Sequence, residues 1–290
     1  MSLDSSDTIK TLGLYWNSGE DKIIYKLAEN TEKPKSQITK RTVLAEIARL
    51  FDSLGLLGPI IVYAKMMIQT LWKRQLTWDE SIPQEAESVW LEFKDQLPLL
   101  NTLKFDRCTV AFYLTEIQLH GFADAGEKGY GACIYLRTTD KCGNHHVALV
   151  GSKSRVAPVQ TVTLPRLELC AALLLSEFYA AVVLSLQYLK FSRTVFWSDS
   201  TISLHWIQTS PHILKTFVLN RVAQIQELTQ PHEWKHVPTH DNPADFSSRG
   251  QLPKDFLINN IWQHGPHWLS QDDGFWPEMS IATFFFHRFQ

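Results

Sequence analysis

Four acidic residues have the types and positions that could do chemistry in this chain. Asp124 and Asp199 each follow an apolar segment with the pattern of a buried strand, whereas Glu168 and Asp245 lie in the first turns of two expected helices. Ligands of α/β sheets bind at the ends of strands and in the loops beside them. We therefore expect the four carboxylates to converge at one edge of a sheet.

A convergent set of carboxylates predicts a metal site. Two carboxylates about 4 Å apart repel each other by roughly 4 kcal/mol at an effective dielectric constant near 20, so four could not stay ionised together without cations. Mg²⁺ prefers oxygen ligands and retains several of its waters. Two such ions about 3.5–4 Å apart activate a water and stabilise the leaving oxygen of a phosphodiester. The chemistry to expect is hydrolysis of a nucleic-acid backbone.

Each acid also has a local explanation that the residues alone leave open. Asp124 could be a turn residue, and Asp199 could cap a helix. Glu168 and Asp245 could simply be favoured by the dipole at a helix N-terminus. Glu168 is the hardest to explain in this way, because its helix is apolar on nearly all sides and a buried carboxylate needs a partner.

The elements that must position these acids follow one another in a recognisable order. Strands are expected at 117–124, 130–137, 146–153, 194–198 and 233–237, and helices at 165–189, 200–208, 216–229 and 243–249, the last ending at Gly250. The order βββαβααβα predicts an α/β fold, a mixed five-stranded sheet with helices on its faces.

A smaller α-rich unit with an N-terminal hairpin precedes this sheet. We expect a hairpin at 10–27 with its turn at 17–20, a loop at 31–38, two helices within 39–75 separated at Gly55, Gly58 and Pro59, and a third helix at 84–97. The predicted division is 1–110 for the α-rich unit, 111–250 for the α/β domain and 251–290 for a Trp-rich extension that packs its rings in an extended form.

Composition excludes several classes of protein. The chain has 290 residues, is 44% hydrophobic and carries a formal net charge of −2, so it is neither disordered nor a strongly basic DNA-wrapping protein. The four cysteines have no CxxC spacing, which predicts neither zinc nor disulfides. No signal peptide is expected, and the apolar stretches 54–72 and 171–189 contain polar residues, so we expect buried helices and no membrane partner.

Four segments around the acids resemble one family. They read GFADAGEKGYGACIYLR, SKSRVAPVQTVTLPRLELCAALL, FWSDSTISLHWI and WKHVPTHDNPADFSSRG, and they resemble the RNase H region of Bel/Pao-type long-terminal-repeat retrotransposon polyproteins, which is often labelled Pao retrotransposon peptidase. The segment from KTLGLYWN to QLTWDE resembles the thumb or connection stretch that follows the reverse transcriptase palm in the same polyproteins. The resemblance covers about residues 8–277.

The resemblance implies an RNase H-like fold, two Mg²⁺ or Mn²⁺ ions and cleavage of the RNA strand of an RNA–DNA hybrid. The family's Asp-Glu-Asp-Asp order falls here on Asp124, Glu168, Asp199 and Asp245, as catalytic residues and metal ligands. Related domains carry a histidine before the last Asp that assists product release, a role that falls on His240, with His236 as the alternative. The implied partner is the palm of the parent polyprotein, and the implied location is a cytoplasmic retroelement particle or the nucleus.

Substrate contacts are expected near the acids, to backbone and 2′-hydroxyl groups, because hybrids are recognised mainly by shape. Ser200 and Asn242 are candidates to contact the RNA strand, and the alternative for both is helix capping. Lys153 and Arg155 are candidates for phosphate contacts, as are Lys128 and Arg166, and the alternative is ordinary solvated charge. Trp197, Trp206 and Trp234 are expected in the core rather than as platforms for bases.

Competing functions can be weighed from the same residues. The acids of an integrase-like nuclease run Asp-Asp-Glu, whereas the Glu is second here. A retropepsin needs Asp-Thr/Ser-Gly, and the nearest segment, Asp52-Ser53-Leu54-Gly55, has Leu at the Gly position and lies in an expected helical segment. The chain contains no Tyr/Phe-x-Asp-Asp polymerase motif, so we expect a fragment or remnant of a larger polyprotein. A catalytically inactive nucleic-acid-binding remnant stays open as an alternative to an active ribonuclease.

Overall fold

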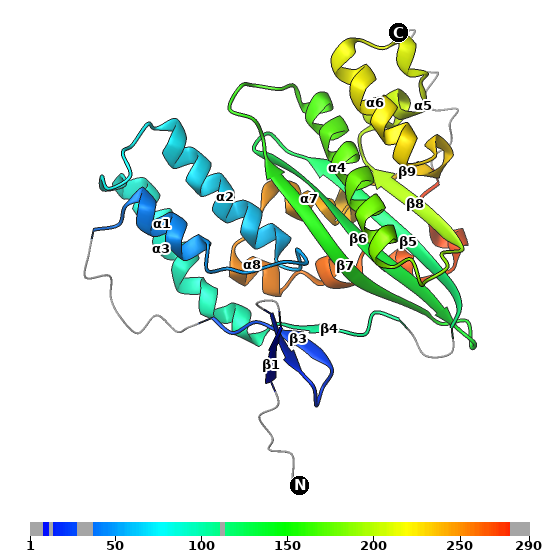
Figure 1. Cartoon of the computed structure of the whole chain (residues 1–290), viewed down its shortest axis with the longest axis horizontal. Coiled ribbons are helices and arrows are strands. Elements are labelled where there is room, and N and C mark those ends of the chain that lie inside the picture. Colours follow the sequence, from blue (N-terminus) through cyan, green and yellow to red (C-terminus); the bar gives the residue numbers. More distant parts are fainter. Residues whose placement is uncertain (1–7, 12–13, 28–36, 111–113, 279–290) are drawn as a thin grey trace.

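The computed structural model describes residues 8–11, 14–27, 37–110 and 114–278 (Figure 1). Most of the loop expected at 31–38 and the last part of the extension expected at 251–290 lie outside these residues.

A mixed five-stranded sheet forms the centre of the described chain. Its strands are β5 (Leu114–Ala125), β6 (Gly129–Asp140), β7 (His145–Val156), β8 (Arg193–Ser198) and β9 (Trp234–His236), in the spatial order β7-β6-β5-β8-β9. The first three strands are antiparallel, and β8 and β9 are added in parallel. With the helices α4 (Leu164–Ser185), α5 (Thr201–Gln208), α6 (Thr216–Leu228) and α7 (Ala244–Arg249), the order βββαβααβα is confirmed.

The sheet is buried on both faces, and the alternation along β5 shows why. Leu119 and Ala123 belong to the apolar cluster that includes α4, whereas Phe122 belongs to a second cluster on the opposite face. Successive side chains of a strand point to opposite faces, so the central strand supplies both layers. The predicted core positions Trp197 and Trp234 are confirmed, because both are buried, and Trp206 is partly buried against the α4 cluster.

Helix α4 is long and apolar enough to cross a membrane by length and composition alone. It packs here against β5, β6 and α6, as Figure 1 shows. A buried core helix passes the same test, and its contacts identify α4 as one.

The N-terminal unit combines a small sheet with three helices. The antiparallel strands β1 (Thr8–Thr11), β2 (Leu14–Asn17), β3 (Lys22–Ile24) and β4 (Lys104–Asp106) accompany α1 (Lys40–Ile47), α2 (Gly58–Lys73) and α3 (Gln84–Gln96). The expected turn lies between β2 and β3, but β1 and β4 enlarge the hairpin to a four-stranded sheet. Thr39 caps α1 through a capping box with Thr42.

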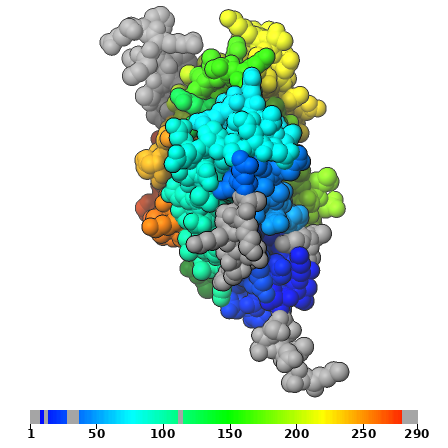
Figure 2. All heavy atoms as spheres, turned by 90° about the vertical axis from the view of Figure 1, so that its left-hand side faces the viewer, coloured from blue at the N-terminus to red at the C-terminus, as the bar shows by residue number. Residues whose placement is uncertain are grey.

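The N-terminal unit and the five-stranded sheet share one core. A single apolar cluster contains Val43 and Ile60 of the helices together with Phe122 and Trp197 of the sheet. Helix α2 contacts both α7 and β7, and Figure 2 shows the helices of the N-terminal unit, coloured blue to cyan, covering one side of the molecule. The packing is continuous across the predicted boundary at residue 110.

The described part of the extension is built of short helices rather than extended chain. It contains α8 (Pro253–Leu257), α9 (Asn260–His264) and two 3₁₀ turns, Leu269 lying in the first of them. Trp262, Trp268 and Trp276 are buried on the face of the sheet opposite α4. The Arg137 guanidinium of β6 is 1% exposed and holds this segment by donating to the backbone carbonyls of Leu269 (3.0 Å) and Gln271 (2.8 Å).

Candidate metal centre

Three of the four predicted carboxylates converge. Asp124 lies at the end of β5, Glu168 in the second turn of α4, and Asp199 directly after β8, and each offers a ligand oxygen within 4.8 Å of the others. Among the described residues, no other group of His, Cys, Asp and Glu meets this criterion.

The pairing of β5 with β8 brings two of these acids together. The strands run parallel with Ala123 opposite Ser198, so the next residues, Asp124 and Asp199, leave the same edge of the sheet. Glu168 reaches this edge from α4, where it accepts a hydrogen bond from the backbone N–H of Ala125. The segment that follows each strand therefore fixes the site, as the strand-end rule predicts.

Burial and mutual repulsion favour the protonated forms of two acids. Burial, followed by the charges of Asp124 and Asp199, raises the pKa of Glu168 to about 9. Burial raises the pKa of Asp124 to about 7, although a hydrogen bond from the Ser248 hydroxyl opposes the shift. Perturbed carboxylates of this kind mark functional sites.

A divalent cation fits the donors that these residues present. Oε2 of Glu168 and Oδ1 of Asp199 are buried and have no hydrogen-bond partner within the protein. The Glu168 residue is only 8% exposed. A buried carboxylate oxygen without a partner is costly, and a cation with a preference for oxygen ligands would satisfy both atoms.

Asp245 lies in the first turn of α7, as predicted, but outside the group of three. Its Oδ1 accepts a hydrogen bond from Nε of Arg249 at 2.6 Å, one turn along the same helix. Burial raises the pKa of Asp245, the charge of Arg249 lowers it, and the charge of Asp199 raises it further. The charge of Asp199 therefore acts on the fourth acid, while Arg249 holds its carboxylate through a hydrogen bond.

Two side chains, Asn242 and Ser248, fix α7 against the sheet. Nδ2 of Asn242 donates to the carbonyl of Ala123 at 3.1 Å, and its Oδ1 accepts from the N–H of Ala244 at 3.2 Å. The hydroxyl of Ser248 donates to Asp124. Asn242 is 2% exposed, so in this structure it ties the start of α7 to β5.

The two candidate histidines differ in their surroundings. His240 is exposed and lies in the 3₁₀ turn Thr239–Asp241, where its Nε2 is 3.7 Å from Asp241. His236 is half-buried at the end of β9, and burial lowers its pKa while the neighbouring Asp199 opposes this shift. The structure thus places His236, the alternative candidate, beside one of the three acids.

The remaining predicted contacts have local partners. Ser200 caps α5 by accepting from the N–H of Ser203. Lys153 is exposed with its Nζ 5.2 Å from the ring centroid of Phe178, and Arg155 is exposed with a long contact of 3.9 Å to Glu177. Both partners belong to α4, so these cations lie along the face that α4 covers.

Arg166 and Lys128 are also exposed, in different settings. Arg166 lies over the ring of Phe217 at 4.9 Å. Lys128 belongs to the turn between β5 and β6 and lines a cavity of about 300 Å³ together with Arg249. Lys128 is therefore the cation of this pair that shares a surface with α7, through Arg249.

Sequence reasoning missed two residues of the site, Ser248 and Arg249. The signal for Arg249 was available, because Asp245 and Arg249 have the i, i+4 spacing of a helical ion pair. Ser248 gave no such signal, since only the packing of α7 on β5 brings it to Asp124.

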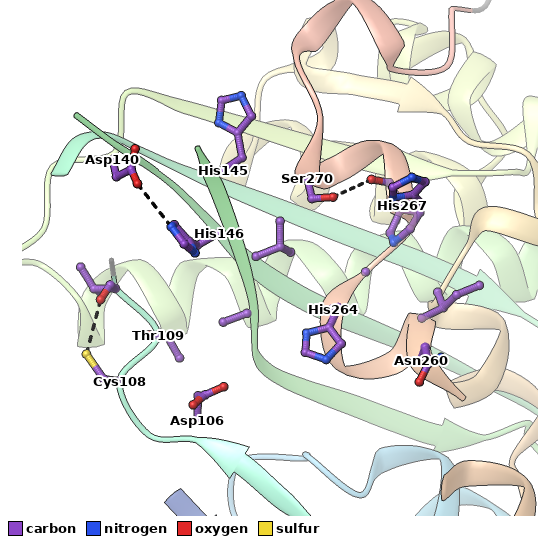
Figure 3. A pocket seen from close by; sticks show the side chains of 16 residues that line it. Asp106, Cys108, Thr109, Asp140, His145, His146, Asn260, His264, His267 and Ser270 are labelled. Atoms are coloured by element: carbon purple, nitrogen blue, oxygen red, sulfur yellow. Dashed lines mark hydrogen bonds and ion pairs between the residues drawn. The ribbon is translucent and has the colours of Figure 1, made fainter. Parts of the chain in front are cut away.

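A larger cavity lies at the other end of the sheet. It measures about 940 Å³ and, as Figure 3 shows, is surrounded by histidines, aspartates and Cys108. His146 lies 3.6 Å from Asp140, and Ser270 donates to the carbonyl of His267. In the described chain these side chains form no group of three or more with ligand atoms within 4.8 Å of one another.

Asp52, the acid of the peptidase-like segment, has a structural role. It lies in the turn before α2 rather than in a helix, which corrects the expected helical segment. Its carboxylate accepts from the N–H groups of Leu56 (2.9 Å) and Leu57 (2.8 Å) and from the hydroxyl of Tyr25 (3.0 Å). Asp52 thereby gives hydrogen-bond acceptors to backbone N–H groups at the start of α2.

A family model described as "Pao retrotransposon-like RNaseH-like domain" matches residues 39–200, more than half of the chain. The chain belongs to this family. The matched range of the Pao retrotransposon-like domain begins at Thr39, so it includes α1–α3, and it ends just after Asp199, so it contains Asp124, Glu168 and Asp199. The prediction of a retrotransposon RNase H region is confirmed.

Solved structures resemble the domain at low identity. The N-terminal RNase H domain of Rv2228c from Mycobacterium tuberculosis is 13% identical with a TM-score of 0.32, over 49% of this chain and 100% of that one. LC11-RNase H1 in complex with an RNA/DNA hybrid is 16% identical with a TM-score of 0.32, over 49% and 99%. A foamy viral protease-reverse transcriptase in complex with dsDNA is 12% identical with a TM-score of 0.27, over 80% and 45%. No curated protein sequence matches the chain.

Proposed function

We propose that this domain is a metal-dependent endonuclease that cleaves the RNA strand of RNA–DNA hybrids, the ribonuclease H of a retrotransposon polyprotein. The convergence of Asp124, Glu168 and Asp199 carries the proposal. Their shared edge of an RNase H-like sheet, the unpartnered oxygens and the raised pKa values of Glu168 and Asp124 support it.

Asp124, Glu168 and Asp199 would hold Mg²⁺ or Mn²⁺, and Asp245 would complete a site for two ions. Bound ions of this kind supply an activated water and neutralise charge on the phosphodiester. The protein's own part is to keep the ligands in place: the N–H of Ala125 orients Glu168, and the hydroxyl of Ser248 orients Asp124. Asn242 holds α7, and therefore Asp245, against β5.

The proposed substrate contacts are polar and basic side chains on the elements that carry these acids or adjoin them. Ser200 follows Asp199 directly and would contact the RNA strand, together with Asn242 if its amide is released. Lys153 and Arg155 are exposed, and they would turn from their contacts with Phe178 and Glu177 to meet phosphates. His240, or His236 beside Asp199, would assist product release.

The wider setting follows from the family. The palm of the parent polyprotein is the proposed partner, in a cytoplasmic retroelement particle or in the nucleus, without a membrane. An inactive nucleic-acid-binding remnant is the second candidate, and the separation of Asp245 from the other three acids favours it. The hydrogen bonds of Asp52 to backbone N–H groups explain its presence by a structural role. They do not favour the aspartic peptidase, which would need this acid in its chemistry.

A strand-specific cleavage assay tests the proposal. The full chain is incubated with a hybrid labelled on either strand, and with duplex DNA, in Mg²⁺ or in a chelator. We expect Mg²⁺-dependent cuts in the RNA strand alone. They should be lost in Asp124→Asn and retained in Asp95→Asn, a matched change at an exposed position of α3. Binding of the hybrid without cleavage would favour the inactive remnant, and cuts in duplex DNA would favour an integrase-like nuclease.

A further inference from the structure

Arg249 is placed where a second metal ion would need the fourth carboxylate. Its Nε lies 2.6 Å from Oδ1 of Asp245, while the ligand oxygens of the other three acids cluster without it. A metal cation and a guanidinium compete for the same lone pairs of a carboxylate oxygen. An ion that used this oxygen of Asp245 would have to displace the guanidinium.

The guanidinium is free to leave. The Arg249 side chain is 65% exposed, whereas that of Asp245 is 23% exposed, so the acid is the fixed partner and the arginine the movable one. The pair spans one turn of a short helix that ends at Gly250, whose φ of +77° stops the helix. Exposed ion pairs contribute little free energy, so a modest competing interaction suffices to separate them.

A destination for the released side chain lies beside it. Arg249, Lys128 and Arg74 line the cavity of about 300 Å³ between α2, α3 and the β5–β6 turn. Its other walls are largely apolar, with Met66 and Trp90 among them, and they include one acid, Glu85, which lies 3.1 Å from Arg74. Because Arg74 pairs with Glu85, Arg249 and Lys128 are the cations of this opening that suit a phosphate of a nucleic-acid backbone, which a guanidinium can bind through two hydrogen bonds.

We propose that Arg249 is a built-in counter-ion of Asp245 that keeps a second divalent ion out of the site until a substrate phosphate draws the arginine away. The inference rests on the proposed nuclease function and adds how substrate binding is coupled to loading of the metal site. Without substrate, the three clustered acids bind one ion. With a hybrid bound, Arg249 turns towards a phosphate beside Lys128, and Asp245 becomes a ligand.

Calorimetric titration of the full chain with Mn²⁺, without substrate, tests this order. We expect one bound ion in the native protein and a second in Arg249→Gln, or a gain in affinity of about 1.5-fold to fivefold, the range expected for removal of a partly exposed ion pair. Arg41→Gln, which removes an exposed pair with Asp79 at 2.7 Å, is the matched control and should titrate as the native protein does.

Two further arms keep the proposal falsifiable. The gain should vanish in the double variant Arg249→Gln, Asp245→Asn, because the carboxylate is then lost. The native protein should take up its second ion when a hybrid with a 2′-O-methylated RNA strand is present. Equal stoichiometry and affinity in the native protein and Arg249→Gln would overturn the proposal. Two ions bound to the native protein without a hybrid would also overturn it. A parallel cleavage assay tests the nuclease function by itself. The titration counts bound ions without turnover, so failure of the Arg249 proposal and failure of the nuclease function give different results.

Discussion

Gly131 on β6 lies directly opposite Asp124 on β5, at the point where the backbone of α7 packs against the sheet. A Cβ atom at Gly131 would lie 2.4 Å from Cβ of Ser247 and 2.9 Å from its carbonyl oxygen. Glycine is needed here because only a residue without a side chain lets α7 approach closely. That approach brings Ser248 and Asp245 to the end of β5.

Gly131→Ala should therefore lower both stability and activity. The added methyl must displace α7 backbone, and such overpacking costs about 1–3 kcal/mol. Urea unfolding should show this loss, and cleavage of the hybrid should fall because Ser248 no longer reaches Asp124. Gly274→Ala is the control, since a Cβ there has nothing within 4 Å. Equal stabilities for the two variants would mean that α7 is not held as described.

Stability of the metal-free protein should fall as the pH rises. Glu168 and Asp124 have pKa values of about 9 and about 7 in the folded protein, above the ordinary values of 4.5 and 3.8. The folded state thus binds more protons than the unfolded state between about pH 4 and 9, and the free energy of unfolding decreases over this range. Below it, both groups are protonated in either state and the penalty is absent.

Unfolding by urea at pH 5.5 and 8.5 in a chelator measures this dependence. We expect a loss of about 2 kcal/mol or more at the higher pH, since each pKa unit is worth about 1.4 kcal/mol. Glu168→Gln should flatten the dependence, because glutamine carries no charge to bury. Added Mg²⁺ should also raise stability at pH 8.5 by binding the folded state. A rise in stability with pH in the chelator would contradict the described burial of these acids.

Arg137→Met should loosen the Trp-rich segment that covers the second face of the sheet. The substitution removes donors to the carbonyls of Leu269 and Gln271 and leaves those groups without partners, at a cost of about 2–4 kcal/mol. Limited proteolysis should then cut within residues 265–278 before the rest of the domain. Arg155→Met, at an exposed position on β7, should leave unfolding and proteolysis unchanged.

Asp52→Asn separates the structural acid from the acids proposed to bind metal. Asparagine retains one acceptor oxygen, so one of the N–H groups of Leu56 and Leu57 loses its partner. The free energy of unfolding should drop by about 1–2 kcal/mol, while cleavage of the hybrid by the folded protein stays unchanged. Loss of cleavage without loss of stability would instead assign Asp52 a part in the chemistry.

The sequence was sufficient for most of the α/β order because its signals are local. Alternating strands, an all-apolar helix with one acid, and Gly250 after the last helix each act within a few residues. β4 escaped prediction because Lys104–Asp106 contains a single buried residue, Phe105, and pairs with a strand about eighty positions earlier. Its existence depends on contacts that no local pattern encodes.

The site shows the same division between local and distant signals. The positions of Asp124 and Asp199 follow from strand ends, and their approach follows from the parallel pairing of the strands. The separation of Asp245 from the other three does not, because it depends on how α7 packs and on Arg249, which donates a hydrogen bond to Oδ1 of Asp245. Likewise Asn242 resembled a helix cap in sequence, and only the packed structure shows its amide donating to Ala123.

Asp199→Asn tests the nuclease assignment most directly. The substitution keeps the shape of the side chain and removes the charge of one clustered ligand, whose Oδ1 has no partner in the protein. Single-turnover cleavage of a hybrid labelled on its RNA strand should be Mg²⁺-dependent in the native chain and slower by at least about a hundredfold in the variant. Equal rates for the two proteins would contradict the metal-dependent site at these acids.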